Sequence, residues 1–421
     1  MPAILLLLPN HSMAGILPAL FLIMSEDAAH ESGQRIGRTQ TDPILCSGSS
    51  PVMSDYPSRG IERREYDDPA IGHRVIQVTC NPEFESKHAY YDICPWSSDG
   101  RYLAFASARP SDLTAPYRDN VSTDKGRICV MDTSTGEIYV LAEDAFYASH
   151  GGAWTLWFPD SHILTFRRAG GTAMIDLDTG EESRLEGCIR QISGDGTRIV
   201  GSSRKLEDTD GVCTMNPDGS DPRCVVRREQ LYELTPNRDE FDLEDMTIGN
   251  FKWHPDNQHI LVAMWVKPRP NVRRSVYIIN RDGSECRWLT HFGHHHSWTP
   301  DGGAVLFNDD ASYETGESEP RPRMHLVDFD GTNRRIVIDE PVGSHPIMNP
   351  KGEIIGDFDR DGIYAVHVAE ERIERLAEFS EPFPMGHDGT HPHCTWHPDG
   401  SRLLYNSAES GHSEVYCTNI E

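Results

Sequence analysis

The sequence predicts an all-β protein, namely a seven-bladed β-propeller closed by an N-terminal strand and preceded by a poorly ordered N-terminal extension. Three observations predict this fold: one hairpin pattern recurs seven times, a second strand pair follows most copies, and Gly (35) and Pro (28) are abundant. Abundant glycine and proline favour many turns between short strands over long helices. Repeated four-stranded antiparallel units are typical of propellers.

The N-terminal segment, residues 1–60, is expected to lie outside the propeller. Its apolar runs 4–8 and 14–24 are interrupted by Pro9, and no Lys or Arg precedes them. Neither run reaches the roughly 20 residues that span a bilayer. Met53 begins a stretch that reads like the start of a soluble protein. We therefore interpret residues 1–60 as poorly ordered or as the product of a mis-set start codon. A signal or membrane anchor is the alternative, and we expect a cytoplasmic location.

The seven hairpins each consist of a strand, a turn rich in Pro, Asp and Gly, and a second strand, and such turn residues tolerate positive φ. They are residues 93–107, 154–168, 189–203, 250–264, 295–309, 345–359 and 393–407. Outer strand pairs are predicted at 127–143, 172–186, 211–226, 275–290 and 324–338. The last copy has only a third strand, 413–420, so residues 74–79 are expected to supply its outer strand and to close the ring. The propeller therefore spans residues 73–421. Its hairpins resemble those of TolB-type propellers.

The composition excludes several classes of function. A net charge of −27 opposes binding to nucleic acid or to an anionic membrane. The ten cysteines form no CxxC pair, which excludes zinc ribbons and thioredoxin motifs and favours free thiols in a reducing compartment. The sequence also has no GxSxG elbow, P-loop, GxGxxG or HExxH motif. The oligomeric state cannot be predicted from the sequence.

Histidines recur at one position of the hairpin pattern. Six residues before the turn residue, three consecutive hairpins carry His295, His345 and His393. These positions begin the innermost strands, which converge at the mouth of the central channel. His391 lies on the same side of its strand as His393, and Asp388 precedes it. The set predicts a divalent metal site, because imidazole binds Mn, Fe, Ni, Cu or Zn; a polar cluster without metal is the alternative. His294 and His296 are expected to point away from it.

These motifs resemble those of the oligogalacturonate lyases, pectin-degrading enzymes on a seven-bladed propeller with a histidine-bound manganese-like ion. The resemblance rests on "GHHHSWTPDG" (293–302), "SHPIMNPKG" (344–352), "THPHCTWHPDG" (390–400) and "VYIINRDGSECRWLT" (276–290). It implies β-elimination from a uronate, with a divalent metal, Mn2+, that neutralises the substrate carboxylate. It also implies that His295, His391 and His393 are ligands, and that Asp388 replaces a glutamine ligand of the family.

One departure from the family concerns the catalytic base. Residues 263–275 contain no histidine where the family has the histidine that is its candidate base. His150 is our candidate catalytic substitute, and His88 is a second one. The same loop concentrates positive charge, which suits a small anionic oligosaccharide. From it we take Arg274 as a catalytic candidate and Lys267, Arg269 and Arg273 as substrate-binding candidates.

Three functional hypotheses remain. The first is a metal-dependent lyase on oligogalacturonate. The second is a metal-dependent enzyme with another reaction on a related sugar acid, which the missing histidine motivates. The third is a non-catalytic propeller that binds a protein or glycan, because such propellers are often binding platforms.

Overall fold

The structure is a computed structural model that describes residues 53–69, 71–113, 122–148, 152–203, 210–266, 274–310, 322–340, 343, 345–359, 361–380 and 391–420. These residues are mostly β-strand. The helices among them are α1 (Arg228–Leu234) and the 3-10 helices η3 (Met53–Asp55), η4 (Pro110–Asp112), η7 (Arg238–Glu240) and η8 (Leu243–Asp245). No helix in these ranges is long and apolar enough to cross a membrane.

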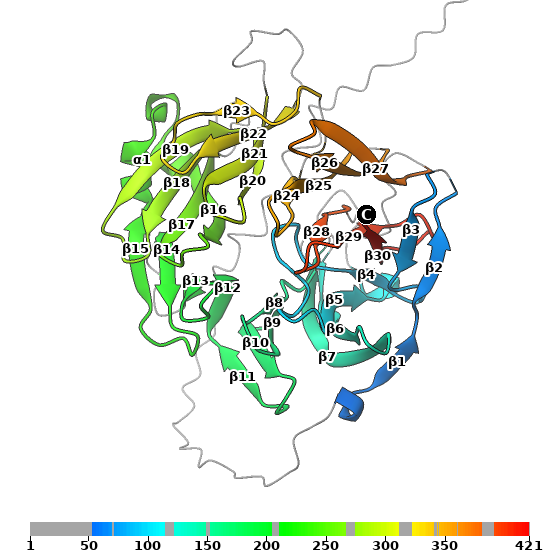
Figure 1. Cartoon of the computed structure of the whole chain (residues 1–421). Coiled ribbons are helices and arrows are strands. Elements are labelled where there is room, and N and C mark those ends of the chain that lie inside the picture. The colour runs from blue at the N-terminus through cyan, green and yellow to red at the C-terminus, as the bar shows by residue number, and fades with distance from the viewer. Residues whose placement is uncertain are drawn as a thin grey trace, which may run out of the picture.

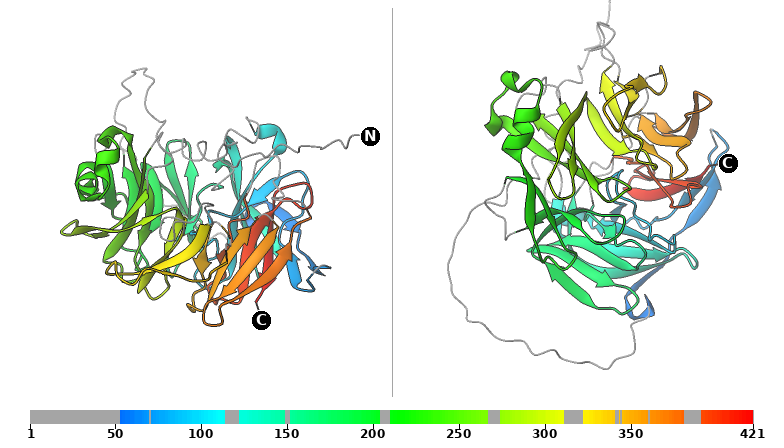
Figure 2. Two further views of the ribbon diagram at one scale, coloured as in Figure 1. Left: turned by 90° about the horizontal axis from the view of Figure 1, so that it is seen from above. Right: turned by 60° about the vertical axis from the view of Figure 1, so that its left-hand side comes forward.

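The strands of the described chain form six antiparallel sheets, which stand side by side around a common centre as in a propeller (Figure 1, Figure 2). The largest sheet has nine strands: β1 (Ser58–Ile61), β4 (Glu85–Lys87), β5 (Tyr102–Ala108), β6 (Ser122–Asp132), β7 (Glu137–Ala148), β8 (Leu156–Trp157), β9 (Ile163–Arg168), β10 (Gly171–Asp176) and β11 (Glu182–Leu185).

Four sheets have four strands each, in chain order. They are β12 (Gly187–Ile192), β13 (Ile199–Ser203), β14 (Gly211–Met215) and β15 (Arg223–Arg227); β16 (Met246–Trp253), β17 (His259–Val266), β18 (Arg274–Asn280) and β19 (Cys286–Phe292); β20 (His294–Trp298), β21 (Ala304–Asp310), β22 (Pro322–Asp328) and β23 (Arg335–Ile336); β24 (Ile347–Met348), β25 (Ile354–Asp359), β26 (Gly362–His367) and β27 (Arg372–Glu378).

The sixth sheet joins the two ends of the described chain. It contains β2 (Arg64–Asp67), β3 (Arg74–Gln77), β28 (Thr395–Trp396), β29 (Arg402–Ser407) and β30 (Glu414–Asn419), in the order β2-β3-β30-β29-β28. The pairing expected for residues 74–79 is present, since Val75 faces Thr418 and Gln77 faces Tyr416. Figure 1 shows the blue N-terminal strands beside the red C-terminal ones.

The predicted hairpins are present, but several inner strands are shorter than expected. β8, β24 and β28 have two residues each. In the first hairpin the predicted inner strand is reduced to a bridge between Trp96 and Leu103, and β4 pairs with β5 in its place. The chain between β4 and Trp96 therefore loops away from the sheet, and this loop reaches the histidines described below.

The end of the predicted extension takes part in the fold. Met53–Asp55 form η3, and β1 pairs with β7. Residues 1–52 lie outside the described residues, so the division into an extension (1–60) and a propeller (73–421) stays a prediction.

Apolar side chains pack between successive sheets. In one such cluster Phe358 and Ile363 of one sheet pack with Trp396 and Tyr405 of the next, and all four are buried. Burying apolar area between sheets is the main stabilising contribution in such an architecture.

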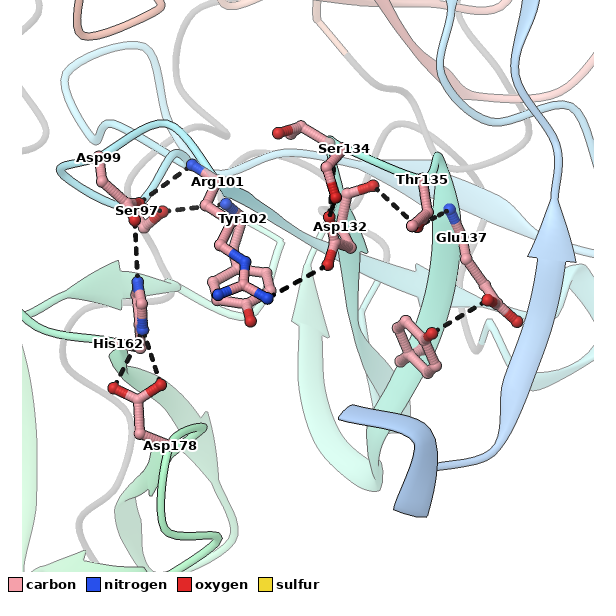
Figure 3. Close-up of polar contacts among 12 residues, drawn as sticks. Ser97, Asp99, Arg101, Tyr102, Asp132, Ser134, Thr135, Glu137, His162 and Asp178 are labelled. Atoms are coloured by element: carbon pink, nitrogen blue, oxygen red, sulfur yellow. Dashed lines mark hydrogen bonds and ion pairs between the residues drawn. The ribbon is translucent and has the colours of Figure 1, made fainter. Parts of the chain in front are cut away.

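The hairpin turns are held by the recurrent aspartate. Its carboxylate accepts hydrogen bonds from a hydroxyl two residues earlier and from the backbone N–H two residues later, as at Asp99 and Asp301 (Figure 3 shows Asp99).

Candidate functional site

The structure brings together the four histidines that were predicted as metal ligands, His295, His345, His391 and His393. One nitrogen each from His345, His391 and His393 lies within 4.8 Å of the other two. The ring of His295 stacks on that of His345, with centroids 3.5 Å apart and planes 28° from parallel. The nitrogens that converge therefore include that of His345, whereas the resemblance to the lyases implied His295 in the ligand set. We call these four residues the histidine cluster.

Backbone geometry explains how the cluster forms. His295 and His393 have φ of 34° and 47°, in the left-handed region that only glycine adopts easily. Trp154 and Asn250, which occupy the same position of the hairpin pattern, also have positive φ. At His295 the ladder between β20 and β21 shifts register between His294 and His296, which is a β-bulge. Bulges turn a side chain out of the sheet and are frequent at functional sites.

Two histidines of the cluster are buried and two are partly exposed, and His345 is held by contacts with the neighbouring strand β25. His345 and His393 are 3% and 1% exposed. The backbone N–H of His345 donates to Asp357 Oδ1 over 2.9 Å, and Phe358 stacks on the His345 ring at 5.1 Å. Buried imidazole rings with fixed backbones are suited to metal binding, because little rearrangement is needed when an ion enters.

Two tyrosines that sequence reasoning missed lie against the histidine cluster. Tyr90 Oη is 3.4 Å from His345 Nε2, and its ring contacts His393 edge-on at 4.6 Å. Tyr91 Oη donates to the carbonyl of His296 (2.8 Å) and accepts from its N–H (3.0 Å). Burial raises the pKa of both tyrosines, so both hydroxyls keep their protons. The loop "YYD" before the first hairpin is the sequence signal that could have indicated them.

An ion pair lies beneath the tyrosines. Lys252 Nζ contacts the Asp92 carboxylate, and it lies 5.2 Å from the centre of the Tyr91 ring. Both side chains are largely buried, at 4% and 14% exposure. A buried charge is retained only when it is paired, so the pair fixes the loop of Asp92 against β16.

Arg274, a predicted catalytic residue, lies close to the cluster. It is the first residue of β18 and donates from Nη1 to the carbonyl of Gly293 over 2.7 Å, directly before the three histidines. Its charge interacts with Tyr90, and burial lowers the pKa of its guanidinium.

The other predicted residues are placed as follows. His150, Lys267, Arg269, Arg273 and Asp388 lie outside the described residues, and so does the side chain of His294. His88 is fully buried, and burial lowers its pKa to about 3, so its ring is neutral. His296 is also fully buried, and its Nε2 lies 3.3 Å from the Asn250 carbonyl. Neither His88 nor His296 reaches solvent, which makes both poor candidates for proton transfer to a ligand.

A cavity of about 610 Å³ opens on the turn side of the sheets. It is lined by the tryptophans and prolines of the repeated hairpins together with Tyr91 and Asp92. Tyr91 therefore lies between this cavity and the histidine cluster.

Comparison with known proteins shows which fold this is. No family model matches the chain. The chain is 21% identical over 397 residues to an oligogalacturonide lyase of Pectobacterium atrosepticum, covering 84% of this chain and 95% of that protein. It superposes on the crystal structure of an oligogalacturonate lyase from Vibrio parahaemolyticus with a TM-score of 0.67 and 16% identity, over 87% and 98% of the two chains. An oligogalacturonate lyase in complex with manganese matches with a TM-score of 0.66 and 18% identity over the same shares. The chain is thus similar to oligogalacturonate lyases in sequence and shares their fold.

Proposed function

We propose that this protein is a metal-dependent polysaccharide lyase that cleaves oligogalacturonate, a pectin fragment, by β-elimination. The observation that carries the proposal is the histidine cluster, in which nitrogens of His345, His391 and His393 come within 4.8 Å of one another. Similarity to proteins named as oligogalacturonate lyases supports the same reaction.

The donor set fits a divalent ion. Three converging imidazoles leave open positions for water or substrate, which distinguishes catalytic from structural metal sites. We propose Mn2+, which a solved oligogalacturonate lyase binds, with His345, His391 and His393 as ligands and His295 and Asp388 as further candidates. When bound, such an ion supplies Lewis acidity that neutralises a uronate carboxylate and acidifies the neighbouring carbon-bound proton.

The chain's own groups would bind and orient the sugar. Arg274 carries positive charge at the edge of the cluster, through its contact with Gly293. We propose that it holds a substrate carboxylate together with Lys267, Arg269 and Arg273 of the preceding loop. His150 remains our candidate for the base that removes the proton.

We also propose that the sheets amount to seven blades in a closed ring. The nine-stranded sheet counts as two blades, one built on β4–β7 and one on β8–β11, joined by a single pairing between Ala145 and Arg168. The β3–β30 pairing closes the ring.

The nine cysteines in the described part of the chain are free, which supports a cytoplasmic location.

Product formation tests the proposed reaction. Purified protein incubated with oligogalacturonate and Mn2+ should produce ultraviolet absorbance from the unsaturated product. His393→Ala should abolish the signal, whereas Tyr139→Phe, far from the cluster, should not change it. No signal with any uronate would exclude the lyase.

A second candidate, a metal-dependent enzyme of a different sugar acid, is favoured by the absence of histidine from residues 263–275. Metal bound in elemental analysis, combined with inactivity on oligogalacturonate, would support it. If purified protein contained no metal at the histidine cluster, the remaining hypothesis would be a non-catalytic propeller that binds a protein or glycan.

A further inference from the structure

A second group of possible metal ligands lies on the turn side of the sheets, where the hairpins turn. His254 follows β16, Asp256 lies in the turn, and His259 begins β17. One donor atom of each residue lies within 4.8 Å of the other two. None of the three belongs to the histidine cluster or to the proposed lyase reaction.

The hydrogen bonds of His254 place a lone pair on the nitrogen that faces Asp256. Its Nε2 lies 2.9 Å from the carbonyl oxygen of Gly302, which can only accept a hydrogen bond, so Nε2 carries the proton. In the neutral ring Nδ1 is then a lone-pair atom. This Nδ1 accepts a hydrogen bond from the backbone N–H of Asp256 over 3.1 Å, and it lies 2.9 Å from Asp256 Oδ1. A metal ion at this point would bind the Nδ1 lone pair in place of that hydrogen bond and would contact the carboxylate as well.

The second oxygen of the same carboxylate has a matching partner. His259 Nδ1 is 2.7 Å from Asp256 Oδ2, so the carboxylate has an imidazole nitrogen on each side. Phe329 packs edge-on against both rings, at 5.2 Å from His254 and 5.1 Å from His259. The two rings are thus held in place before any ion arrives, which lowers the entropic cost of binding.

The other hairpins show that this arrangement is not required by the turn. At the position of His254 three of them have Ser97, Ser193 and Thr299, whose hydroxyls donate to the turn aspartate over 2.6–2.7 Å. The β28–β29 hairpin repeats the histidine and the aspartate, with His397 Nδ1 2.8 Å from Asp399 Oδ1. There the residue that corresponds to His259 is Arg402, which cannot be a ligand.

The group is accessible from two sides. His254 lines the cavity of about 610 Å³, and His259 lines a separate cavity of about 370 Å³. Zinc binds imidazole nitrogen at about 2.0–2.1 Å and carboxylate oxygen at about 2.0–2.2 Å, usually with four ligands. Three protein atoms with this spacing leave the fourth position to water, after small side-chain rotations.

We propose that His254, Asp256 and His259 form a second metal site for a borderline divalent ion such as Zn2+. The ion takes the place of the Asp256 N–H at His254 Nδ1 and of the proton shared between His259 Nδ1 and Asp256 Oδ2, which is released to solvent. Because His254 also contacts Gly302, the bound ion fastens the β16–β17 turn to the β20–β21 turn of the next sheet.

Zinc stoichiometry tests the site. Metal-free full-length protein is titrated with Zn2+ in competition with a chromophoric chelator, and we expect two ions per chain. His259→Arg, which introduces the residue found in the β28–β29 hairpin, should reduce the count to one while circular dichroism stays unchanged. Asp256→Asn should do the same. An unchanged count in both variants would overturn the proposal.

Matched variants separate this site from the histidine cluster. His397→Gln alters the sister hairpin and should leave the count at two; loss of an ion there would show a general effect of turn disruption and overturn the assignment. His391→Ala combined with His393→Ala should remove the other ion and leave the one at Asp256. If that double variant loses no ion while His259→Arg still does, the proposed function fails and the second site stands.

Discussion

At the scale of single residues, the Tyr91 hydroxyl holds the backbone from which His295 projects. It donates to the backbone carbonyl of His296 and accepts from the backbone N–H of the same residue, and its ring lies edge-on to His295 at 5.4 Å. The neighbouring His295 has φ of 34°, a conformation that costs about 1–3 kcal/mol and persists only where the surroundings enforce it. We therefore infer that Tyr91 is a positioning residue for the histidine cluster.

Tyr91→Phe tests this inference, because it keeps the ring and removes only the hydroxyl. It leaves a buried N–H and a buried carbonyl of His296 unsatisfied, which should lower the free energy of unfolding by about 1–3 kcal/mol. We also expect weaker Mn2+ binding at the cluster, followed by manganese EPR in titrations. Tyr139→Phe, which removes a hydrogen bond to the half-buried Glu137, is the control. Manganese affinity equal to that of the unchanged protein would assign Tyr91 a purely structural role.

The residues of the cluster differ in how far the sequence predicts them. His345 and His393 are found by counting back from a repeated turn, because each hairpin reuses one local geometry. Tyr91 meets His296 across 205 positions of the chain, and no local pattern encodes such a contact. The sequence does not indicate the positive φ of His295 either, because a histidine at this position is equally compatible with an ordinary extended strand.

At the scale of elements, His162 connects the turn of the first hairpin to the β10–β11 turn. Its Nδ1 lies 2.8 Å from Asp178 Oδ1, and its Nε2 lies 3.1 Å from Asp99 Oδ2 (Figure 3). Burial lowers the pKa of His162, but the hydrogen bonds to the two carboxylates outweigh this and raise it above its usual 6.5. Burial raises the pKa of Asp99, but hydrogen bonds from the Ser97 hydroxyl, the Arg101 N–H and His162 outweigh this and lower it to about 2, so its carboxylate is ionised throughout the neutral range.

The stability of this connection should therefore depend on pH. Because the folded-state pKa of His162 is raised, its contribution is complete below about pH 6.5 and is lost as pH rises through the folded-state value. The carboxylates are half-exposed or more, which limits the effect to about 0.5–1 kcal/mol. Urea unfolding of the unchanged protein and of His162→Gln should differ by this amount at pH 6 and converge at pH 9. A difference that stays constant with pH would contradict the ion-pair account.

The elements also show why strand boundaries were less predictable than strand pairs. Turn residues and alternating apolar positions indicated the hairpins correctly, because both are local. The inner strands β24 and β28 begin two residues after His345 and His393, respectively, because the chain there turns to present the rings instead of pairing. The alternation of apolar and polar residues does not distinguish a paired strand from a segment that turns away from the sheet.

At the scale of the whole molecule, the fold is fastened where the N-terminal part of the chain meets the C-terminal strand. β3 pairs with β30 over Val75–Gln77, and Val75 is 1% exposed. The side chains add hydrogen bonds, since Thr418 Oγ1 donates to the Arg74 carbonyl and Gln77 donates to the buried Glu414. Without β3, the strand β30 would be an open edge with unpaired backbone groups, which promotes aggregation.

Two truncated variants test the contribution of the β3–β30 pairing to stability. One begins at Met53 and keeps β1–β3, and the other begins at Cys80 and lacks them. Loss of the β3 ladder and of the buried Val75 should cost several kcal/mol, which corresponds to a fall in Tm of about 10 °C or more for the shorter variant. Thermal unfolding and size-exclusion chromatography measure the stability and the aggregation. Val75→Ala in the longer variant should lower Tm in the same direction but by less, whereas Tyr66→Ala on the exposed β2 should change it little. Equal Tm values for the two truncations would show that the stability of the fold does not depend on the β3–β30 pairing.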